Sequence, residues 1–423
     1  MPADHIDIVL HGFTHGAEAV GRLPNGKACF VGHAIPGERV RVEIIEERDR
    51  WARARLVAVL EPSPDRIDPP CPHFGPQRCG GCAIQHVAPA RQATLKRQVV
   101  IDQLERIGGI PDPPVVATIT PGELGYRNRA RFAVDDAGRL GFRRAGTHDV
   151  LPIDRCPLLD PAAQAVREEA GDGWQGVEEV SVRAAVAGEG AAMTVTPGPD
   201  ALPPLPPGTT PVALLDDTGA AHALRGDPTV VERVAGFDYR ISARSFFQAN
   251  TAGAEVLVAE VRGAAAVQPG DAVADLYAGV GLFSRPLAAD GATVVAVEGD
   301  ATACEDARYN LANTTASVVC EPVVAAVRRM AAEVRATARP GDDQAGFAVV
   351  VLDPPRRGAG RDVCGRIASL RPRTIVYVSC DPAALARDAR VLAKAGYHLT
   401  RAVPVDQFAQ TATIEVVATF ARR

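Results

Sequence analysis

The sequence lacks several features that would assign it to common protein classes. In 423 residues, no hydrophobic run approaches the roughly 20 residues that span a bilayer, and the first residues lack the basic-then-apolar pattern of a secretory signal. Aromatic residues make up only 5% and the net charge is −5, so the chain is not a globally basic nucleic-acid binder. We expect a cytoplasmic protein with no membrane association and no obligate protein partner, in which any contact with phosphates depends on a local basic patch.

The nine cysteines are an odd number, which argues against a disulfide framework and favours metal binding or catalysis. Cys71, Cys79 and Cys82 form a tight cluster, and Cys156 is available as a fourth thiolate. Four thiolates suit either zinc or an iron–sulfur cluster. Zinc sites more often pair their cysteines in two short hairpins, whereas the split here is three plus one. The cysteines that have no partner pattern are expected to be packing residues: Cys29, Cys304, Cys320 and Cys364.

The pattern along the chain divides it into three regions. Residues 1–62 contain short strands separated by glycines, which predict a small β-barrel. Residues 63–244 begin with the cysteine cluster and a helix at 90–107, and continue as a β-rich domain with a proline-rich loop at 197–211. From 245 to 423, apolar strands alternate with helices, which indicates a parallel sheet covered on both faces. The expected fold class is multidomain α/β, with a C-terminal Rossmann-like domain. The expected strands of the barrel are 6–10, 28–31, 39–45 and 52–60.

A glycine-rich turn follows the apolar strand at 272–276. Gly279 and Gly281 let the backbone pass close to a ligand, and Glu298 ends the next strand, where a carboxylate can accept the ribose hydroxyls of a nucleoside. Asp275 precedes the turn, where it would repel a pyrophosphate but suits a cationic methionine group. The three-glycine dinucleotide fingerprint is absent. These features favour S-adenosylmethionine over NAD.

Two further strand ends carry groups suited to chemistry on a pyrimidine. Asp353 follows the strand at 347–352 and Cys380 follows the strand at 374–378, and ligands of open α/β sheets bind at the carboxyl ends of strands. A thiolate that attacks carbon 6 of uracil makes carbon 5 nucleophilic enough to take a methyl group. A base must then remove the carbon-5 proton, and Glu415 is the candidate.

Together, these motifs, the cysteine cluster and the barrel resemble the RNA uracil-5 methyltransferase family over nearly the whole chain. The resemblance implies a class I methyltransferase domain, an N-terminal TRAM domain as in the family's ribosomal-RNA branch, Cys380 as nucleophile and Glu415 as base. It also implies a 4Fe-4S cluster, in preference to zinc, held by Cys71, Cys79, Cys82 and Cys156. Further residues that the resemblance assigns to the cofactor site are Gln248, Tyr277, Glu298 and Asp353.

Arg127, Arg129 and Arg131 alternate in the sequence, so on a strand they share one face and can contact successive RNA phosphates. The target base must leave its stack for both of its faces to be reached. Large-subunit ribosomal RNA is the favoured substrate by the resemblance, and transfer RNA is the alternative. Two further alternatives are a cytidine C5 methyltransferase, which commonly carries a thiol where this chain has Pro354 and Pro355, and a non-catalytic RNA-binding protein that retains the methyltransferase fold.

Overall fold

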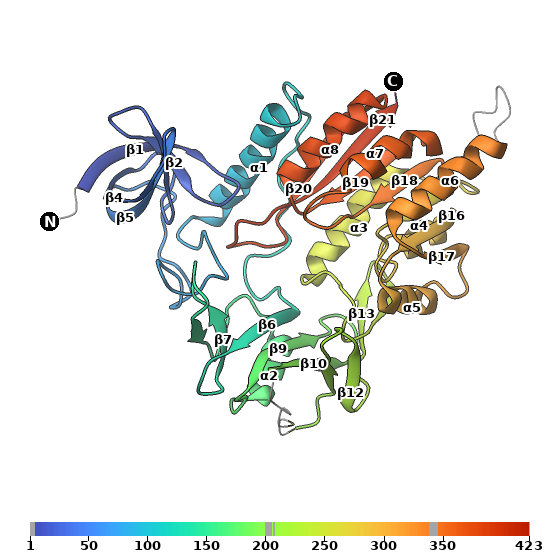
Figure 1. Ribbon diagram of the computed structural model, residues 1–423, viewed down its shortest axis with the longest axis horizontal. Coiled ribbons are helices and arrows are strands. Elements are labelled where there is room, and N and C mark those ends of the chain that lie inside the picture. The colour runs from blue at the N-terminus through green and yellow to red at the C-terminus, as the bar shows by residue number, and fades with distance from the viewer. Residues whose placement is uncertain (1–4, 199–204, 206–207, 338–345, 423) are drawn as a thin grey trace.

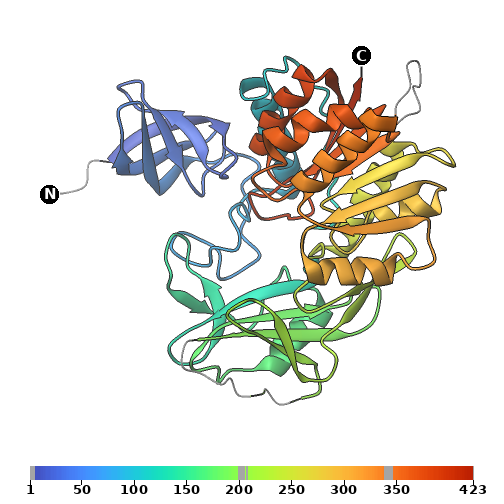
Figure 2. The same cartoon turned by 45° about the vertical axis from the view of Figure 1, so that its right-hand side comes forward.

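The computed structural model describes residues 5–198, 205, 208–337 and 346–422. Figure 1 shows a barrel at the N-terminus, a sheet below it and an α/β unit at the C-terminus, and the turned view in Figure 2 shows the same three parts. Within these ranges, no helix is both long and apolar enough to cross a bilayer. Most of the proline-rich loop predicted at 197–211 lies outside the described residues.

The N-terminal strands form a closed barrel in the order β1–β2–β3–β5–β4, which confirms the expected barrel. Sequence reasoning missed β2. This short strand contains Gly21, which lowers its β-propensity. A Cβ at Gly21 would lie 2.8 Å from the carbonyl oxygen of Val9 on β1, so the close approach of the two strands requires the residue that hid the strand. The strands are β1 (His5–Phe13), β2 (Ala19–Arg22), β3 (Ala28–Val31), β4 (Arg39–Glu47) and β5 (Trp51–Glu61).

The central sheet has the strand order β12–β11–β10–β9–β6–β7–β8. Helix α2 (Pro161–Ala170) covers one face, where Phe132, Trp174 and Val180 are buried. A separate hairpin, β13–β14, leads into the C-terminal unit. The strands are β6 (Arg129–Val134), β7 (Leu140–Arg143), β8 (Val150–Pro152), β9 (Val177–Ala184), β10 (Ala191–Pro197), β11 (Val212–Leu215), β12 (Ala221–Arg225), β13 (Val230–Val234) and β14 (Phe237–Ile241).

The C-terminal sheet has the order β17–β16–β15–β18–β19–β21–β20. Its strands are parallel up to β19, whereas β21 runs antiparallel to both of its neighbours. The inner parallel strands β15, β18 and β19 are almost wholly apolar and buried, as parallel strands covered on both faces must be. They are β15 (Ala272–Leu276), β16 (Thr293–Glu298), β17 (Ala316–Cys320), β18 (Val349–Leu352), β19 (Thr374–Ser379), β20 (Tyr397–Val405) and β21 (Glu415–Arg422).

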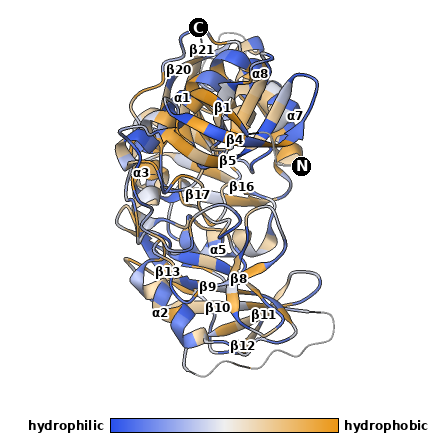
Figure 3. Ribbon diagram, turned by 90° about the vertical axis from the view of Figure 1, so that its left-hand side faces the viewer, coloured by the Kyte–Doolittle hydropathy of each residue, from blue (hydrophilic) through white to orange (hydrophobic). Residues whose placement is uncertain are grey.

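Helices pack on both faces of this sheet and form a separate apolar core on each. Helices α3 and α4 contribute to one core, and α1, α6, α7 and α8 contribute to the other; Figure 3 shows hydrophilic residues on the outer side of α7 and α8. The expected multidomain α/β fold is therefore confirmed. The helices are α1 (Pro89–Arg106), α3 (Thr251–Ala265), α4 (Ser284–Ala289), α5 (Ala301–Asn310), α6 (Val323–Thr337), α7 (Gly360–Ile367) with the 3₁₀ turn Ala368–Leu370, and α8 (Pro382–Lys394).

Helix α1 belongs to the region predicted as the central domain, yet it packs against α8 of the C-terminal unit, and Val100 and Leu104 are buried in the core shared with α6, α7 and α8. Figure 1 shows the two helices side by side. The domain boundaries at residues 62 and 244 stay predictions. The position of α1 nevertheless means that the segment following the cysteine cluster touches the C-terminal sheet directly.

Candidate active site

Four parallel strands bring the predicted chemical groups to one edge of the C-terminal sheet. Strands β15, β16, β18 and β19 pair in register, so that their carboxyl ends lie at the same level. Asp275 and Glu298 are carried by β15 and β16, while Asp353 and Cys380 directly follow β18 and β19. Glu415 begins β21, which pairs with β19 through Ser379 and Val416. The sheet thus gathers five residues that are far apart in the sequence.

Asp275 is fully buried, and one of its oxygens lacks a partner. Ser284 Oγ donates to Asp275 Oδ2 over 2.6 Å, but Oδ1 has no hydrogen-bond partner within the described residues. Burial raises the pKa of Asp275 to about 7; the hydrogen bond from Ser284 opposes this shift and the nearby Glu298 adds to it. A cationic ligand group placed beside Oδ1 would satisfy it and favour its ionised form. The site therefore fits the charged end of S-adenosylmethionine.

The glycine turn is held against Glu298. The backbone amide of Gly279 donates to Glu298 Oε2 over 2.9 Å, and Glu298 Oε1 accepts from the amides of Gly299 and Asp300. Gly279 and Gly281 have φ values of +56° and +92°, which favour glycine. A Cβ at Gly279 would meet no heavy atom within 4 Å. The turn is thus open on the side of Gly279, where a nucleoside can approach.

The remaining predicted cofactor residues, Tyr277 and Gln248, are placed differently from each other. Tyr277 packs against the core formed with α7 and α8, and burial raises the pKa of its phenol to about 12. Gln248 is buried in the segment between β14 and α3, and its Oε1 accepts from Gln407 Nε2 over 3.1 Å. The side chain of Gln248 therefore connects to the chain just before Glu415.

Cys380, Asp353 and Glu415 form a coupled group. Burial, followed by the charges of Glu415 and Asp353, raises the pKa of the Cys380 thiol to about 12, while Arg356 acts in the opposite direction. Burial likewise raises the pKa of Glu415 to about 7. For Asp353 the pKa lies well above its ordinary value because of burial, then Glu415, then Asp275. A carboxyl group with a pKa near neutrality, beside a protonated thiol, can exchange protons during a reaction.

Sequence reasoning missed Gln407, which is fully buried and donates to Gln248. It also missed the buried ion pair that anchors this segment, in which Lys96 Nζ on α1 contacts Asp406 Oδ1 at 2.6 Å. Each of these contacts joins parts of the chain that are far apart in the sequence. No local pattern signals them.

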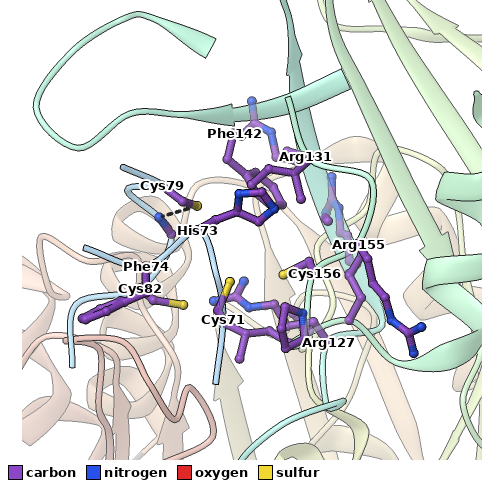
Figure 4. Close-up of a pocket in the computed structure, with 18 of the residues that line it drawn as sticks. Cys71, His73, Phe74, Cys79, Cys82, Arg127, Arg131, Phe142, Arg155 and Cys156 are labelled. Carbon is purple, nitrogen blue, oxygen red and sulfur yellow. Dashed lines mark hydrogen bonds between the residues drawn. The ribbon is translucent and has the colours of Figure 1, made fainter. Parts of the chain in front are cut away.

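The four predicted cysteine ligands line one cavity of about 470 Å³ between the Cys71–Cys82 loop and the segment before α2. Figure 4 shows the sulfur atoms of Cys71, Cys82 and Cys156 around one space, with Cys79 further along the loop. Burial and the neighbouring thiols raise the pKa of Cys82 to about 12. In the described part of the chain, however, no three or more Cys, His, Asp or Glu side chains are arranged closely enough to form a metal site.

The three predicted RNA-binding arginines line this same cavity. Strand β6 begins only at Arg129, so Arg129 and Arg131 lie on it and Arg127 does not. Arg131 is exposed and paired with Glu179 at 2.7 Å, whereas burial lowers the pKa of Arg129. Arg127 lies over the rings of Tyr126 and Phe408. The three arginines therefore line the same cavity as the cysteines, and Arg131 is the most exposed of them.

One expectation about the scattered cysteines is wrong. Cys304 on α5 and Cys320 at the end of β17 form a disulfide, with their Cα atoms 5.9 Å apart. The helix–turn–strand connection between them folds back on itself, so residues 16 positions apart become neighbours; the sequence shows no pattern for this. Cys29 and Cys364 are buried free thiols, as expected.

Comparison with known proteins gives consistent results. The TRAM domain profile matches residues 5–57, and the profile described as tRNA (Uracil-5-)-methyltransferase matches residues 228–423. An RNA methyltransferase of undefined activity from Streptomyces coelicolor is 37% identical over 99% of this chain and 93% of its own length. A protein named 23S rRNA (uracil(1939)-C(5))-methyltransferase from Alkalilimnicola ehrlichii is 35% identical over 100% of this chain and 98% of its own length.

Among solved structures, the tRNA (uracil-54, C5)-methyltransferase of Pyrococcus abyssi, in complex with S-adenosyl-L-homocysteine, is similar over 98% of this chain and 99% of its own. The TM-score is 0.74 and the sequence identity is 25%. The similarity therefore extends across the barrel, the central sheet and the C-terminal unit.

Proposed function

Since this chain belongs to the family of S-adenosylmethionine-dependent RNA (uracil-C5)-methyltransferases, we propose that it methylates a uridine of large-subunit ribosomal RNA, with Cys380 as nucleophile and Glu415 as base. The observation that carries the residue assignment is the convergence of Cys380, Asp353 and Glu415 at one sheet edge. The ribosomal substrate is supported by relatives named for 23S rRNA whose similarity covers the whole chain, barrel included.

The reaction follows from these positions. Cys380 releases its proton to water, and its sulfur forms a bond to carbon 6 of the uracil, which moves the electron pair of the 5,6 double bond to carbon 5. S-adenosylmethionine supplies the methyl group that carbon 5 takes up. Glu415 then removes the carbon-5 proton, the double bond re-forms, and the bond between carbon 6 and sulfur breaks, so that the electron pair returns to Cys380.

The proposed cofactor site combines two carboxylates with an unobstructed glycine turn. Asp275 offers its unpaired oxygen to the cationic end of the cofactor, and Glu298 offers its carboxylate to the ribose. The turn at Gly279 leaves room for the nucleoside. The other proposed contacts are Gln248, Tyr277, Gly281 and Asp353.

For the cysteine cavity, we propose a 4Fe-4S cluster held by Cys71, Cys79, Cys82 and Cys156, with zinc as the alternative. A donor set of sulfur alone, lining one cavity, supports either group. When bound, it would cross-link the loop to the segment before α2. The guanidiniums of Arg127, Arg129 and Arg131 would complement both the thiolates and RNA phosphates at the cavity mouth.

Transfer RNA is the second candidate substrate. It is favoured by the likeness, over nearly the full length of both chains, to a structure whose protein is named for uridine 54 of transfer RNA. Both substrates demand the same chemistry, so the strand-edge residues alone do not distinguish them.

The test is a methyl-transfer assay on unmodified transcripts. Anaerobically purified protein is incubated with labelled S-adenosylmethionine and either large-subunit ribosomal RNA fragments or transfer RNA, and the product is mapped by mass spectrometry. We expect 5-methyluridine at one position of the ribosomal transcript and none with Cys380→Ala. Labelling of transfer RNA alone would show that transfer RNA, not ribosomal RNA, is the substrate. Formation of 5-methylcytidine in either transcript would overturn uridine as the target nucleoside. A protein that binds cofactor and RNA but labels neither would be a non-catalytic RNA-binding protein.

A further inference from the structure

Asn128 lies between two arginines that line the cysteine cavity, yet its own side chain contacts the segment that carries a proposed cofactor residue. Arg127 and Arg129 both line the cavity. Asn128 is buried, and its Nδ2 donates to the carbonyl oxygen of Gln248 over 3.1 Å and to Thr251 Oγ1 over 3.2 Å. Adjacent residues of one short segment thus serve two different proposed sites.

Gln248 lies in an irregular stretch between β14 and α3, so its place depends on contacts with other parts of the chain. At the start of the stretch, Ser245 Oγ donates to Asp306 Oδ2 over 2.6 Å, and Arg183 on β9 donates to the carbonyl oxygen of Ser245 over 2.7 Å. At the end that carries Gln248, the side chain that holds the backbone is Asn128. The central sheet therefore holds this stretch at both of its ends.

The backbone of Asn128 is fixed independently of its side chain. Its amide donates to the carbonyl oxygen of Ala249 over 2.9 Å, and its own carbonyl oxygen accepts from the amide of Ala184 on β9 over 3.0 Å. Both bonds use the main chain alone and remain when the side chain is replaced. The contribution of the side-chain amide can therefore be measured separately.

The Asn128 amide links Gln248 to the first turn of α3. Thr251 is the first residue of that helix, and its hydroxyl donates to Glu232 Oε2 over 3.0 Å while its oxygen accepts from Asn128. The same Nδ2 atom bonds the carbonyl oxygen of Gln248. One donor group thus fixes the Gln248 backbone relative to the helix that follows it.

We propose that Asn128 is a positioning residue that holds Gln248 in place for the binding of S-adenosylmethionine. The proposal rests on the function proposed above, in which Gln248 contacts the cofactor. The Asn128 amide holds the Gln248 backbone, and Gln407 Nε2 holds the Gln248 side chain over 3.1 Å. A small displacement of a binding group weakens its contribution strongly. The central sheet therefore contributes to cofactor affinity as well as to the cysteine cavity.

The experiment compares Asn128→Leu with Gln248→Met, the double variant, Gln92→Met and the unaltered full-length protein. Leucine keeps the branched shape of asparagine and removes the amide. Gln92 is the matched control, because its buried amide also joins distant segments, donating to Gln410 Oε1 over 2.8 Å and to the carbonyl oxygen of Val87 over 2.8 Å. Calorimetry gives the dissociation constant of S-adenosylmethionine, and methyl-transfer kinetics give kcat and the KM of each substrate.

A positioning role predicts a specific pattern of constants. Asn128→Leu should raise both the dissociation constant and the KM of S-adenosylmethionine about tenfold, with kcat and the KM of the RNA changed less than about twofold. The double variant should bind the cofactor no more weakly than Gln248→Met, because the place of residue 248 matters only while its amide is present. Gln92→Met should lower the unfolding midpoint but leave cofactor binding unchanged.

The outcomes separate this proposal from the function on which it rests. Unchanged cofactor affinity in Asn128→Leu would overturn the positioning role, and so would additive losses in the double variant. Full affinity in Gln248→Met would remove Gln248 from the cofactor site and the proposal with it. If the unaltered protein binds the cofactor and the variants behave as expected, but no uridine is methylated, the proposed reaction fails and the positioning role stands.

A smaller substitution covers the case in which Asn128→Leu does not fold. If circular dichroism shows that this variant is unfolded, Asn128→Ala takes its place, because it keeps the backbone bonds of residue 128 and adds no bulk. It should show the same loss of cofactor affinity. Normal affinity in Asn128→Ala would refute the positioning role.

Discussion

The strand-edge site and the cysteine cavity both contain partly buried thiols, but they are built in opposite ways. At the strand edge, each group sits at the end of a regular element, and the surroundings of Cys380 are acidic. In the cavity, three of the four cysteines lie on a loop without helix or strand, and the surroundings are rich in arginine. A parallel sheet positions groups without help from a ligand. A long loop depends on cross-links, so we expect the first site to be preformed and the second to depend on what its thiols bind.

The largest effect should come from the strand edge. Cys380→Ala removes the proposed nucleophile and should lower methyl transfer by at least about 10⁴-fold, because no other group in the described part of the site is placed to form the bond to carbon 6. The midpoint of thermal unfolding should stay within about 2 °C, since less than one kcal/mol of packing is lost. Cys29→Ala, a buried thiol in the barrel, is the control and should retain activity. Substantial methylation by Cys380→Ala would remove this residue from the mechanism.

The next effect concerns the buried ion pair between Lys96 on α1 and Asp406 in the segment before β21. Lys96→Met leaves Asp406 buried without its cation and should lower the free energy of unfolding by about 3–5 kcal/mol, as measured by urea denaturation. The double variant Lys96→Met/Asp406→Asn removes the stranded charge and should recover part of the loss. If Lys96→Met were as stable as the unaltered protein, the packing of α1 against the segment before β21 would not depend on this ion pair.

A smaller effect is expected from the cavity. Cys156→Ser should abolish metal binding at the proposed cluster site and lower stability by about 2–3 kcal/mol, or roughly 5–10 °C in the unfolding midpoint, because the loop would lose a cross-link. Metal analysis of anaerobic protein and calorimetry measure both. Binding of S-adenosylmethionine should change less than about twofold. If cofactor affinity fell as far as stability, the strand-edge site would not be preformed.

The smallest effect should follow from Arg131→Gln. This arginine is the most exposed of the three at the cavity and already pairs with Glu179, so its loss should weaken RNA binding only about two- to fivefold and lower the salt slope of binding by about 1. Arg139→Gln, an exposed arginine paired with Asp135 outside the cavity lining, is the matched control. Equal losses in both variants would mean that the cavity mouth does not meet RNA.

The sequence was sufficient to predict that the strand-edge residues lie at one sheet edge, because the carboxyl ends of parallel strands always meet at the same edge. Once 272–276 and 374–378 are recognised as parallel strands, Asp275 and Cys380 must lie at the same edge. The same rule does not predict that Arg127, Arg129 and Arg131 line the cysteine cavity, nor that Gly21 belongs to a strand. Gln407, the Lys96–Asp406 pair and the Cys304–Cys320 disulfide depend on side chains that meet only after folding, so no local pattern reveals them.

The contacts of Gln410 also bear on how the protein is made. Its carbonyl oxygen accepts from the backbone amides of Ala83 and Ile84, directly after the cysteine loop, and its side chain pairs with Gln92, 318 positions earlier. At a translation rate of about 5–20 residues per second, the cysteine loop waits many seconds on the ribosome for this partner. The contacts that hold the cysteine loop against the segment before Glu415, the proposed base, can therefore form only near the end of synthesis.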